Sequence, residues 1–256
     1  MVYIVGIGPG HKNYIIPKAV DVMEKVHKVL GFKRAIESLY FIKNEKVEVK
    51  SLKEIVEYIN NNCHEDIAIA ASGDPCYYGI TNYIKNNYKG QIEVITGISS
   101  FQYMMSKIAL PWNEAFTGSM HGREEDFVDM VKSHKISIWL TDKKNTPDEL
   151  CKKLLKAGLN LTDKSIKTVD KVSKLSGTGV MKSTELTADL IESVVETAGT
   201  GLVESRKSIG TGVGIKVYVG ENLSYDDEKI SSGTLSEMAR KSYSDLCVVV
   251  IEKCIL

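Results

Sequence analysis

Three times within the first hundred residues, a short apolar run leads directly into small residues and glycine. The runs are residues 2–7, 67–71 and 92–95, and each has the length of a buried strand. The loops that follow contain Gly6-Ile7-Gly8-Pro9-Gly10, Ser72-Gly73-Asp74-Pro75 and Thr96-Gly97-Ile98-Ser99-Ser100. Open α/β sheets bind ligands at the edge where their strands end. The pattern therefore predicts one ligand cleft built from three loops.

Strand and helix patterns alternate over the first 110 residues. Helical spacing of apolar residues occurs at 19–26 and 52–59, with strand candidates at 29–30 and 47–49. Such alternation is typical of parallel strands joined by right-handed crossovers. A second unit follows Leu110-Pro111, with helices expected at 124–132, 147–157 and 235–241 and strands at 136–141, 216–219 and 246–252. We predict an α/β protein of two α/β domains, residues 1–111 and 112–256.

Residues 161–214 differ in character from the rest of the second unit. They are rich in Lys, Ser, Thr and Gly and contain three Gly-Thr-Gly triplets, at 177–179, 199–201 and 210–212. Apolar spacing predicts two amphipathic helices joined by glycine turns. A surface insertion is the favoured interpretation, because long insertions cost little loop entropy. A lid or an oligomer interface is the alternative.

Composition argues against several classes of function. Lys plus Arg equals Asp plus Glu at 33 each, and no basic tract predicts a nucleic-acid partner. The five cysteines form no C-x-x-C pair and the histidines have no metal-ligand spacing, so we expect no metal and a reducing, cytoplasmic location. The apolar stretch 246–251 is far below the roughly 20 residues of a membrane helix, so we expect no membrane partner.

Familiar nucleotide and catalytic motifs do not fit. His11 stands where a dinucleotide fingerprint needs glycine, and Arg206 stands where a P-loop needs its second glycine. No nucleophile–base order and no paired carboxylates stand out. Asp74 has two interpretations, a loop-capping aspartate or a carboxylate beside a cationic ligand. Arg123 can bind a carboxylate bidentately or merely cap its turn.

Taken together in their order and spacing, the three glycine loops resemble the tetrapyrrole (corrin/porphyrin) methylase family. Four further stretches resemble the branch that methylates carbon 5 of a precorrin, namely residues 31–34, 119–123, 139–142 and 219–228. The resemblance covers residues 1–160 and 216–252, and segment 161–214 departs from it. It implies two α/β domains with S-adenosylmethionine bound in the cleft between them, in a homodimer.

The resemblance also implies site residues. Those expected to bind the cofactor are Pro9, Ser72, Gly73, Asp74, Tyr77, Ser99, Ser100, Leu140, Thr141 and Gly220. Those expected to bind the substrate are Lys33, Arg34, His121, Arg123 and Glu221. No catalytic residue is assigned, and His121, Glu221 and Asp142 are hypotheses for proton handling.

The function that the resemblance implies is S-adenosylmethionine-dependent methylation of carbon 5 of a cobalt-precorrin of the precorrin-6B type, in cobalamin biosynthesis. Some relatives carry a second methyltransferase that methylates carbon 15 and decarboxylates the ring. This chain ends at Leu256 without it, so a separate partner enzyme is expected. The alternatives are methylation of another ring carbon, a non-tetrapyrrole substrate such as a modified elongation-factor histidine, or a cofactor-binding module that has lost catalysis.

Overall fold

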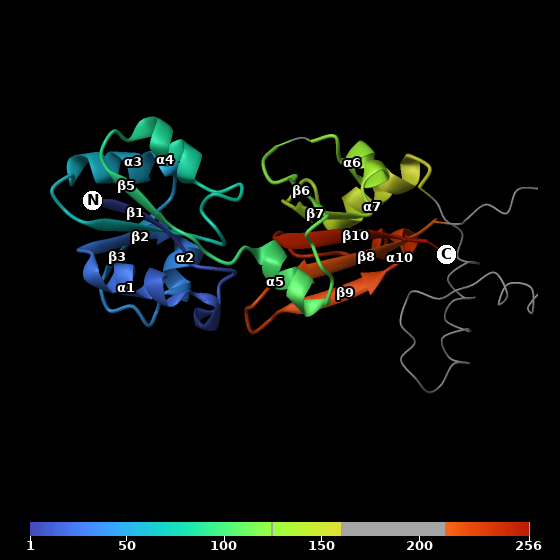
Figure 1. The fold of residues 1–256 in the computed structure, drawn as a ribbon, viewed down its shortest axis with the longest axis horizontal. Coiled ribbons are helices and arrows are strands. Elements are labelled where there is room, and N and C mark those ends of the chain that lie inside the picture. Colours follow the sequence, from blue (N-terminus) through green and yellow to red (C-terminus); the bar gives the residue numbers. More distant parts are fainter. Residues whose placement is uncertain (124, 160–212, 256) are drawn as a thin grey trace, which may run out of the picture. The chain divides into compact units, whose positions relative to one another are not determined.

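Two five-stranded sheets organise the chain (Figure 1). The computed structural model describes residues 1–123, 125–159 and 213–255, so the two helices expected within 161–214 lie outside the described residues. Both sheets belong to one unit, Met1–Leu159 with Ile215–Lys253. The predicted α/β class is confirmed, whereas the domain limits at 111 and 112 remain a prediction.

The first sheet is wholly parallel, as the alternating pattern predicted. Its strands are β1 (Val2–Gly6), β2 (Lys28–Phe32), β3 (Glu45–Val49), β4 (Ile67–Ala71) and β5 (Ile92–Ile95). They run in the order β3-β2-β4-β1-β5, and each pairing is parallel. The carboxyl ends of β4, β1 and β5 are therefore neighbours, which brings the three glycine loops to one edge.

Helices cover both faces of this sheet because its strands are apolar on both sides. The helices are α1 (Pro17–Lys25), α2 (Lys33–Ser38), α3 (Leu52–Asn61) and α4 (Thr81–Asn87), and a 3-10 turn spans Lys12–Tyr14. In β4, Ile67 and Ile69 belong to the core beneath α3 and α4, whereas Ala68 and Ala70 belong to the core beneath α1 and α2. Figure 1 shows the two helix pairs on opposite faces.

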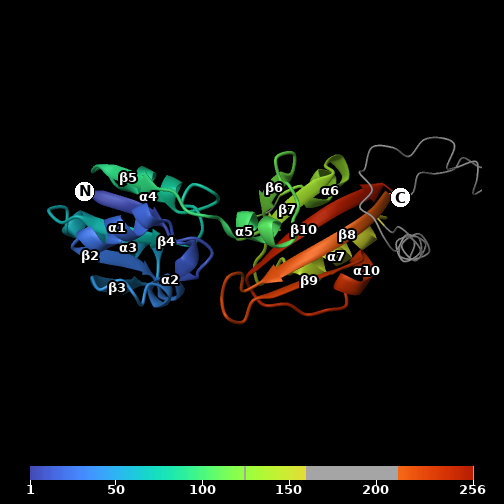
Figure 2. The same cartoon turned by 60° about the horizontal axis from the view of Figure 1, so that its bottom comes forward.

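The second sheet is mixed. Its strands are β6 (Phe116–Ser119), β7 (Ile136–Leu140), β8 (Val213–Glu221), β9 (Lys229–Gly233) and β10 (Cys247–Ile255), in the order β6-β7-β10-β8-β9. β6 pairs with β7 in parallel, while the β7–β10 and β8–β9 pairs are antiparallel. β8 and β10 lie side by side in both ribbon views (Figure 2). The sequence patterns had indicated β7, β8 and β10 but neither β6 nor β9.

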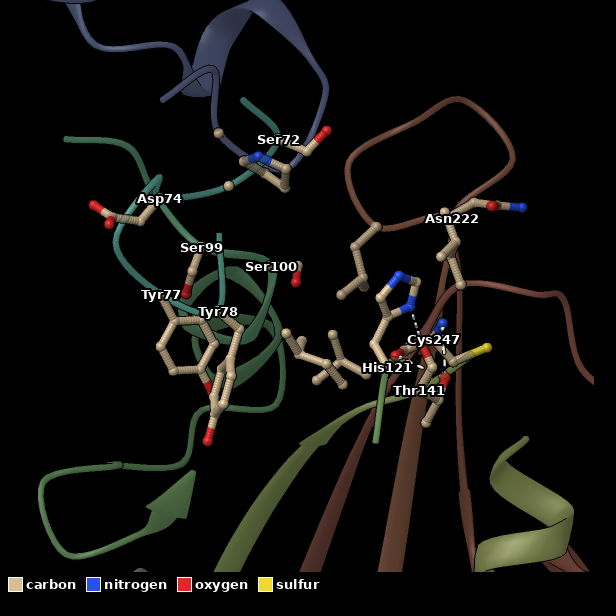
Figure 3. A pocket seen from close by; sticks show the side chains of 18 of the residues that line it. Ser72, Asp74, Tyr77, Tyr78, Ser99, Ser100, His121, Thr141, Asn222 and Cys247 are labelled. Atoms are coloured by element: carbon tan, nitrogen blue, oxygen red, sulfur yellow. Dashed lines mark hydrogen bonds between the residues drawn. The ribbon is translucent and has the colours of Figure 1, made fainter. Parts of the chain in front are cut away.

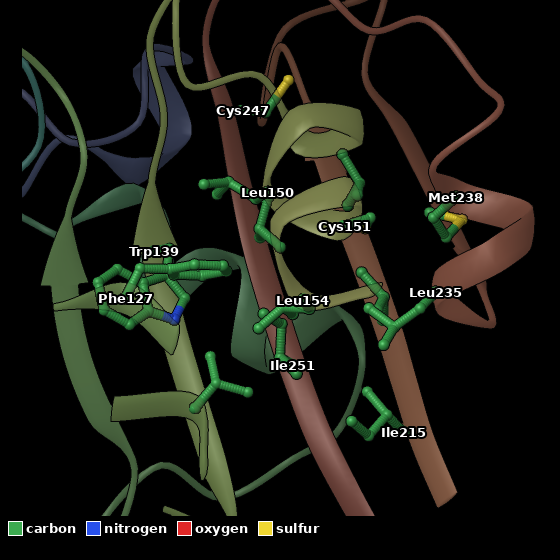
Figure 4. Close-up of a cluster of buried hydrophobic side chains, with 14 of the residues drawn as sticks. Phe127, Trp139, Leu150, Cys151, Leu154, Ile215, Leu235, Met238, Cys247 and Ile251 are labelled. Atoms are coloured by element: carbon green, nitrogen blue, oxygen red, sulfur yellow. The ribbon is translucent and has the colours of Figure 1, made fainter. Parts of the chain in front are cut away.

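A core of large apolar side chains lies on one face of this sheet, under α6 (Phe127–Ser133), α7 (Pro147–Lys156) and α10 (Leu235–Met238). Trp139 is fully buried there, with its ring 4.8 Å from that of Phe127 in an edge-on arrangement (Figure 4). The opposite face packs against α5 (Ser100–Lys107), through Phe101, Met104 and Met105. Because α5 directly follows the third glycine loop, that loop is held close to the second sheet.

Candidate active site

The three glycine loops touch backbone to backbone. A Cβ atom on Gly97 would lie 2.2 Å from the carbonyl oxygen of Gly73 and 2.8 Å from the Cα atom of Gly6. A Cβ atom on Gly6 would lie 2.6 Å from the amide nitrogen of Gly97. No side chain fits between these loops, so glycine at both positions is what lets them form one surface.

The first and second loops are also joined by hydrogen bonds. The Gly73 amide donates to the Gly8 carbonyl at 2.7 Å, and the Gly8 amide donates to the Gly73 carbonyl at 3.3 Å. Both glycines have left-handed backbones, with φ of +70° at Gly8 and +68° at Gly73. The two loops thus form an antiparallel bridge just beyond the parallel β1–β4 pair, and Pro9 and Ser72, which follow and precede these glycines, both border the cavity described below.

Asp74 ties the second loop to the third. Its carboxylate accepts hydrogen bonds from the Cys76 amide at 2.8 Å, the Thr96 hydroxyl at 2.6 Å and the Gly97 amide at 3.1 Å. Burial raises the pKa of this carboxyl, but the hydrogen bonds from Thr96, Cys76 and Gly97 outweigh it and the pKa is lowered. Figure 3 shows the carboxylate turned away from the cavity. The loop-capping interpretation therefore describes this side chain.

A cavity of about 290 Å³ lies between these loops and the end of the second sheet where β7 and β8 finish and β10 begins (Figure 3). All ten residues expected to bind the cofactor border it. Seven come from the three glycine loops. The other three are Leu140 and Thr141 at the end of β7 and Gly220 in β8. The structure thus brings together residues that are far apart in the chain.

Only two of the five residues expected to bind the substrate border this cavity. Arg34 and His121 border the cavity. Arg123 does not, but its guanidinium lies 4.7 Å from the ring centre of Tyr78, which does. Lys33 lies on the exposed surface of α2, with its ammonium 3.9 Å from a Glu37 carboxylate oxygen. Glu221 is buried, outside the cavity lining.

The buried Glu221 carboxylate accepts a hydrogen bond from the Ser244 amide at 2.8 Å. It holds the loop that precedes β10 against the end of β8. This contact gives Glu221 a role in joining two segments of the second sheet.

His121 is oriented by the strand next to it. Its Nδ1 atom lies 3.2 Å from the Thr141 carbonyl oxygen. A carbonyl can only accept, so Nδ1 carries the proton and Nε2 of the neutral ring is an acceptor. Figure 3 shows the ring at the cavity wall, with its other nitrogen directed away from Thr141. The geometry provides a proton acceptor at this wall.

Asp142 anchors the turn that carries His121. Its carboxylate accepts hydrogen bonds from the amides of Gly122, Lys144 and Asn145, at 2.8, 2.9 and 2.7 Å. Burial raises the pKa of Asp142, but these three amides, with a smaller contribution from His121, lower it to about 2. A carboxylate with so low a pKa is a poor proton acceptor, so the geometry makes Asp142 a positioning residue.

Thr141 and Cys247 join β7 to β10 at the cavity wall. The Thr141 hydroxyl donates to the Cys247 carbonyl at 3.0 Å and accepts from the Cys247 amide at 3.2 Å. The Thr141 side chain is therefore engaged within the sheet. Burial raises the pKa of the Cys247 thiol to about 11. The thiol stays protonated and is no nucleophile at neutral pH.

Sequence reasoning missed several residues that border the cavity, most clearly Tyr78, Asn222, Leu223, Tyr225 and Cys247. Two of them have unusual backbones, since φ is +52° at Tyr78 and +46° at Asn222. Non-glycine residues in this region carry strain that is concentrated at functional sites. The only sequence signal for Asn222 and Tyr225 was their place in the stretch 219–228.

The described residues offer neither a metal site nor a membrane-spanning helix. Within residues 1–123, 125–159 and 213–255, no three His, Cys, Asp or Glu side chains are grouped so that they could hold a metal ion. In the same ranges, no helix is long and apolar enough to cross a membrane.

Comparisons with known proteins agree with a two-sheet α/β enzyme of this geometry. The sequence profile of the Tetrapyrrole (Corrin/Porphyrin) Methylases matches residues 1–174, which is more than half of the chain. The chain therefore belongs to the tetrapyrrole methylases and is a methyltransferase. The family expected from the glycine loops is confirmed.

Individual relatives refine the comparison. A probable cobalt-precorrin-7 C(5)-methyltransferase of Methanocaldococcus jannaschii is 29% identical over 262 residues, which span 98% of this chain and 98% of that protein. A probable cobalt-factor III C(17)-methyltransferase of Methanothermobacter thermautotrophicus is 32% identical over 124 residues, or 44% of this chain and 35% of that protein.

Solved structures share the fold at low sequence identity. A precorrin-6Y methylase of Archaeoglobus fulgidus has a TM-score of 0.64 at 17% identity and covers 100% of this chain and 99% of its own. A uroporphyrin-III C-methyltransferase of Thermus thermophilus, in complex with S-adenosylhomocysteine, has a TM-score of 0.66 at 17% identity and covers 98% and 91%. These likenesses establish the fold.

Proposed function

We propose that this chain transfers a methyl group from S-adenosylmethionine to carbon 5 of a cobalt-precorrin of the precorrin-6B type, in cobalamin biosynthesis. The observation that carries the proposal is the full-length match to a relative named for carbon-5 methylation. The relative named for carbon 17 matches less than half of the chain. The end-to-end similarity favours carbon 5 over the other ring carbons.

The residues around the cavity fit S-adenosylmethionine, which joins an apolar adenine to polar ribose and methionine groups. The Ser72 and Ser100 hydroxyls make no hydrogen bond to another described residue and are available as donors. Leu140, Leu223 and Val248 supply apolar surface on the opposite wall. When bound, the cofactor supplies an electrophilic methyl group on a sulfonium. The cavity residues hold it in place and limit its contact with water.

Methyl transfer to a ring carbon requires the methyl group and that carbon to be held in line, and it requires no covalent intermediate with the protein. Holding two reactants in line lowers a barrier by roughly 7 to 11 kcal/mol. The new carbon–carbon bond uses an electron pair of the ring, so the ring gains one positive charge and regains its former charge when a proton leaves. His121 Nε2 is the acceptor that the geometry offers for that proton.

An acidic macrocycle requires positive charge near the cavity. Arg34 and Arg123 are the proposed carboxylate-binding residues, and each guanidinium lies over a tyrosine ring, of Tyr225 and Tyr78 respectively. Lys33 adds exposed positive charge at the start of α2. We leave Glu221 out of the substrate site because its carboxylate is engaged by Ser244.

Three further features complete the proposal: the cytoplasmic location is supported by the cysteine content, and the homodimer and the partner enzyme by the family resemblance. The enzyme works in the cytoplasm and forms a homodimer, and a decarboxylating C(15)-methyltransferase is its proposed partner. The proposed domains, residues 1–111 and 112–256, each supply one wall of the cavity. The neutral balance of charged residues provides no sign of a nucleic-acid partner.

The test is a turnover assay read by mass spectrometry, with S-adenosylmethionine and either cobalt-precorrin-6B or its metal-free analogue. We expect a gain of one methyl group, located at carbon 5 by magnetic resonance of a labelled product. A methyl group at another carbon would move the chain to a different ring position. Cofactor binding with no mass gain on either substrate would favour a module that has lost catalysis.

A further inference from the structure

Arg34 is unusual among the basic residues of this chain. The sequence contains only four arginines against 29 lysines. The Arg34 guanidinium lies 4.3 Å from the ring centre of Tyr225, in the loop between β8 and β9. Within the described part of the chain, Arg34 makes no ion pair and no side-chain hydrogen bond. Its N–H donors are therefore available to a ligand.

The Tyr225 ring packs directly against Gly10, the last glycine of the first loop. A Cβ atom on Gly10 would lie 2.3 Å from the Tyr225 ring, and the Gly10 backbone has φ of +139°. The two loops are also joined by a hydrogen bond of 2.9 Å from the His11 amide to the Ser224 hydroxyl. Any residue larger than Gly10 would therefore clash with the Tyr225 ring. The packing of this ring fixes the surface that the Arg34 guanidinium contacts.

The same two residues border a second cavity. It has a volume of about 360 Å³, and Arg34 and Tyr225 line both this cavity and the central one of about 290 Å³. The remaining lining residues are Gly10, His11, Lys12, Glu37, Ser38, Tyr40 and Asp226. A ligand that lies against Arg34, at the edge of the central cavity, can therefore place a side chain in the second cavity.

The lining of the second cavity carries two cationic and two acidic side chains. Lys12 and Arg34 are its cations, and the Lys12 ammonium lies 5.8 Å from the ring centre of Tyr40. Glu37 and Asp226 are its acids, and Glu37 lies 3.9 Å from the ammonium of Lys33, outside the lining. The formal charge of the lining is therefore zero, but neither Lys12 nor Arg34 forms an ion pair in the described part of the chain, so both cations are available to an anionic group.

We propose that the second cavity is a carboxylate subsite, which binds one acetate or propionate side chain of the macrocycle. Arg34 binds the carboxylate through two parallel N–H donors and Lys12 adds charge. Tyr225 is a positioning residue that keeps the guanidinium plane fixed, and Gly10 makes room for it. The inference rests on the proposed function for one point, that the ligand body is a tetrapyrrole.

The test uses uroporphyrin III, a fluorescent tetrapyrrole with eight carboxylates, titrated into the full chain in the presence of S-adenosylhomocysteine. We expect Arg34→Lys to weaken uroporphyrin binding about ten- to a hundredfold, because the paired donors are lost. Tyr225→Leu should weaken it about fivefold and Tyr225→Phe hardly at all, because phenylalanine keeps the ring. Arg240→Lys, at an exposed arginine outside both cavities, is the matched control.

Thermal unfolding separates the subsite from general damage, since Arg34→Lys and Arg240→Lys should both unfold at nearly the temperature of the wild-type chain while only Arg34→Lys loses uroporphyrin affinity. Wild-type affinity of Arg34→Lys for uroporphyrin would overturn the subsite, as would a wild-type chain that binds no uroporphyrin. Selective competition by inorganic phosphate over chloride at equal ionic strength would identify a phosphate site instead. Loss of binding in Arg34→Lys, together with no turnover of cobalt-precorrin-6B by the wild-type chain, would retain the subsite and reject cobalt-precorrin-6B as the substrate.

Discussion

At the scale of single residues, the polar side chains around the cavity have two kinds of task. Asp74, Thr141 and Asp142 direct their side chains to neighbouring loops and strands. Ser72 and Ser100 leave theirs available within the described structure. Residues of the first kind set the shape of the cavity, so their substitution is expected to alter folding and binding together. Residues of the second kind should alter binding alone.

His121 offers a sharp test at this scale. We expect His121→Gln to lower kcat about a hundredfold or more and to leave KM nearly unchanged, because a lost proton acceptor slows a step after binding. Single-turnover kinetics with cobalt-precorrin-6B measures this, and calorimetry with S-adenosylhomocysteine checks that the cavity is intact. Full kcat in the variant would remove His121 from the reaction.

The lowered pKa of Asp142 predicts that the free energy of unfolding depends on pH. Its pKa is about 2 in the folded chain, against an ordinary value of 3.8. A lowered pKa means that the folded state prefers the ionised form, so the stabilisation is present above pH 3.8 and lost as the pH falls towards 2. The loss in Asp142→Asn should be on the order of 1 kcal/mol near pH 5, limited by the partial exposure of the group.

Urea unfolding of wild-type and Asp142→Asn chains between about pH 5 and pH 2.5 measures the difference. We expect the two free energies of unfolding to converge as the pH falls. A constant difference across this range would show that the carboxylate's ionisation is not involved.

At the scale of elements, the backbones of the three glycine loops are in contact where β1, β4 and β5 end. We expect Gly97→Ala to destabilise the fold by about 1–3 kcal/mol, because the new methyl group must displace the Gly73 backbone. S-adenosylhomocysteine binding should weaken with it. Thermal unfolding and calorimetry measure the two effects.

Gly158→Ala is the matched control, since Gly158 has φ of +80° and a Cβ atom added there would have nothing within 4 Å. Its cost is backbone strain alone, about 1 kcal/mol, and ligand binding should not change. Equal effects of the two substitutions on binding would contradict the loop contact.

Sequence patterns predicted β4, whose side chains are all buried, and missed β9, whose side chains are largely exposed. β4 is apolar at every position and was predicted from end to end. β6 and β9 lie at the two edges of the second sheet, and β9 reads Lys-Ile-Ser-Ser-Gly. An edge strand is held by backbone pairing to one neighbour and needs few apolar side chains. Its sequence therefore carries a weak signal.

At the scale of the whole molecule, the proposed homodimer is open to direct measurement. We expect light scattering after size exclusion to give twice the chain mass of 28.4 kDa. If this chain buries a stable dimer interface, the doubled mass should persist when the protein is diluted to micromolar concentration. A mass of 28.4 kDa at all concentrations would reject the homodimer and leave the methyltransferase proposal unchanged.

The sequence by itself determined the α/β class, the parallel first sheet and the family, because apolar periodicity and glycine loops are local signals. It also named ten residues that border one cavity. Only the tertiary structure decided what each side chain does there. Asp74 faces a neighbouring loop, Glu221 meets Ser244, and Gly10 makes room for the ring beneath Arg34. Such contacts join residues far apart in the chain, and no local pattern encodes which of them meet.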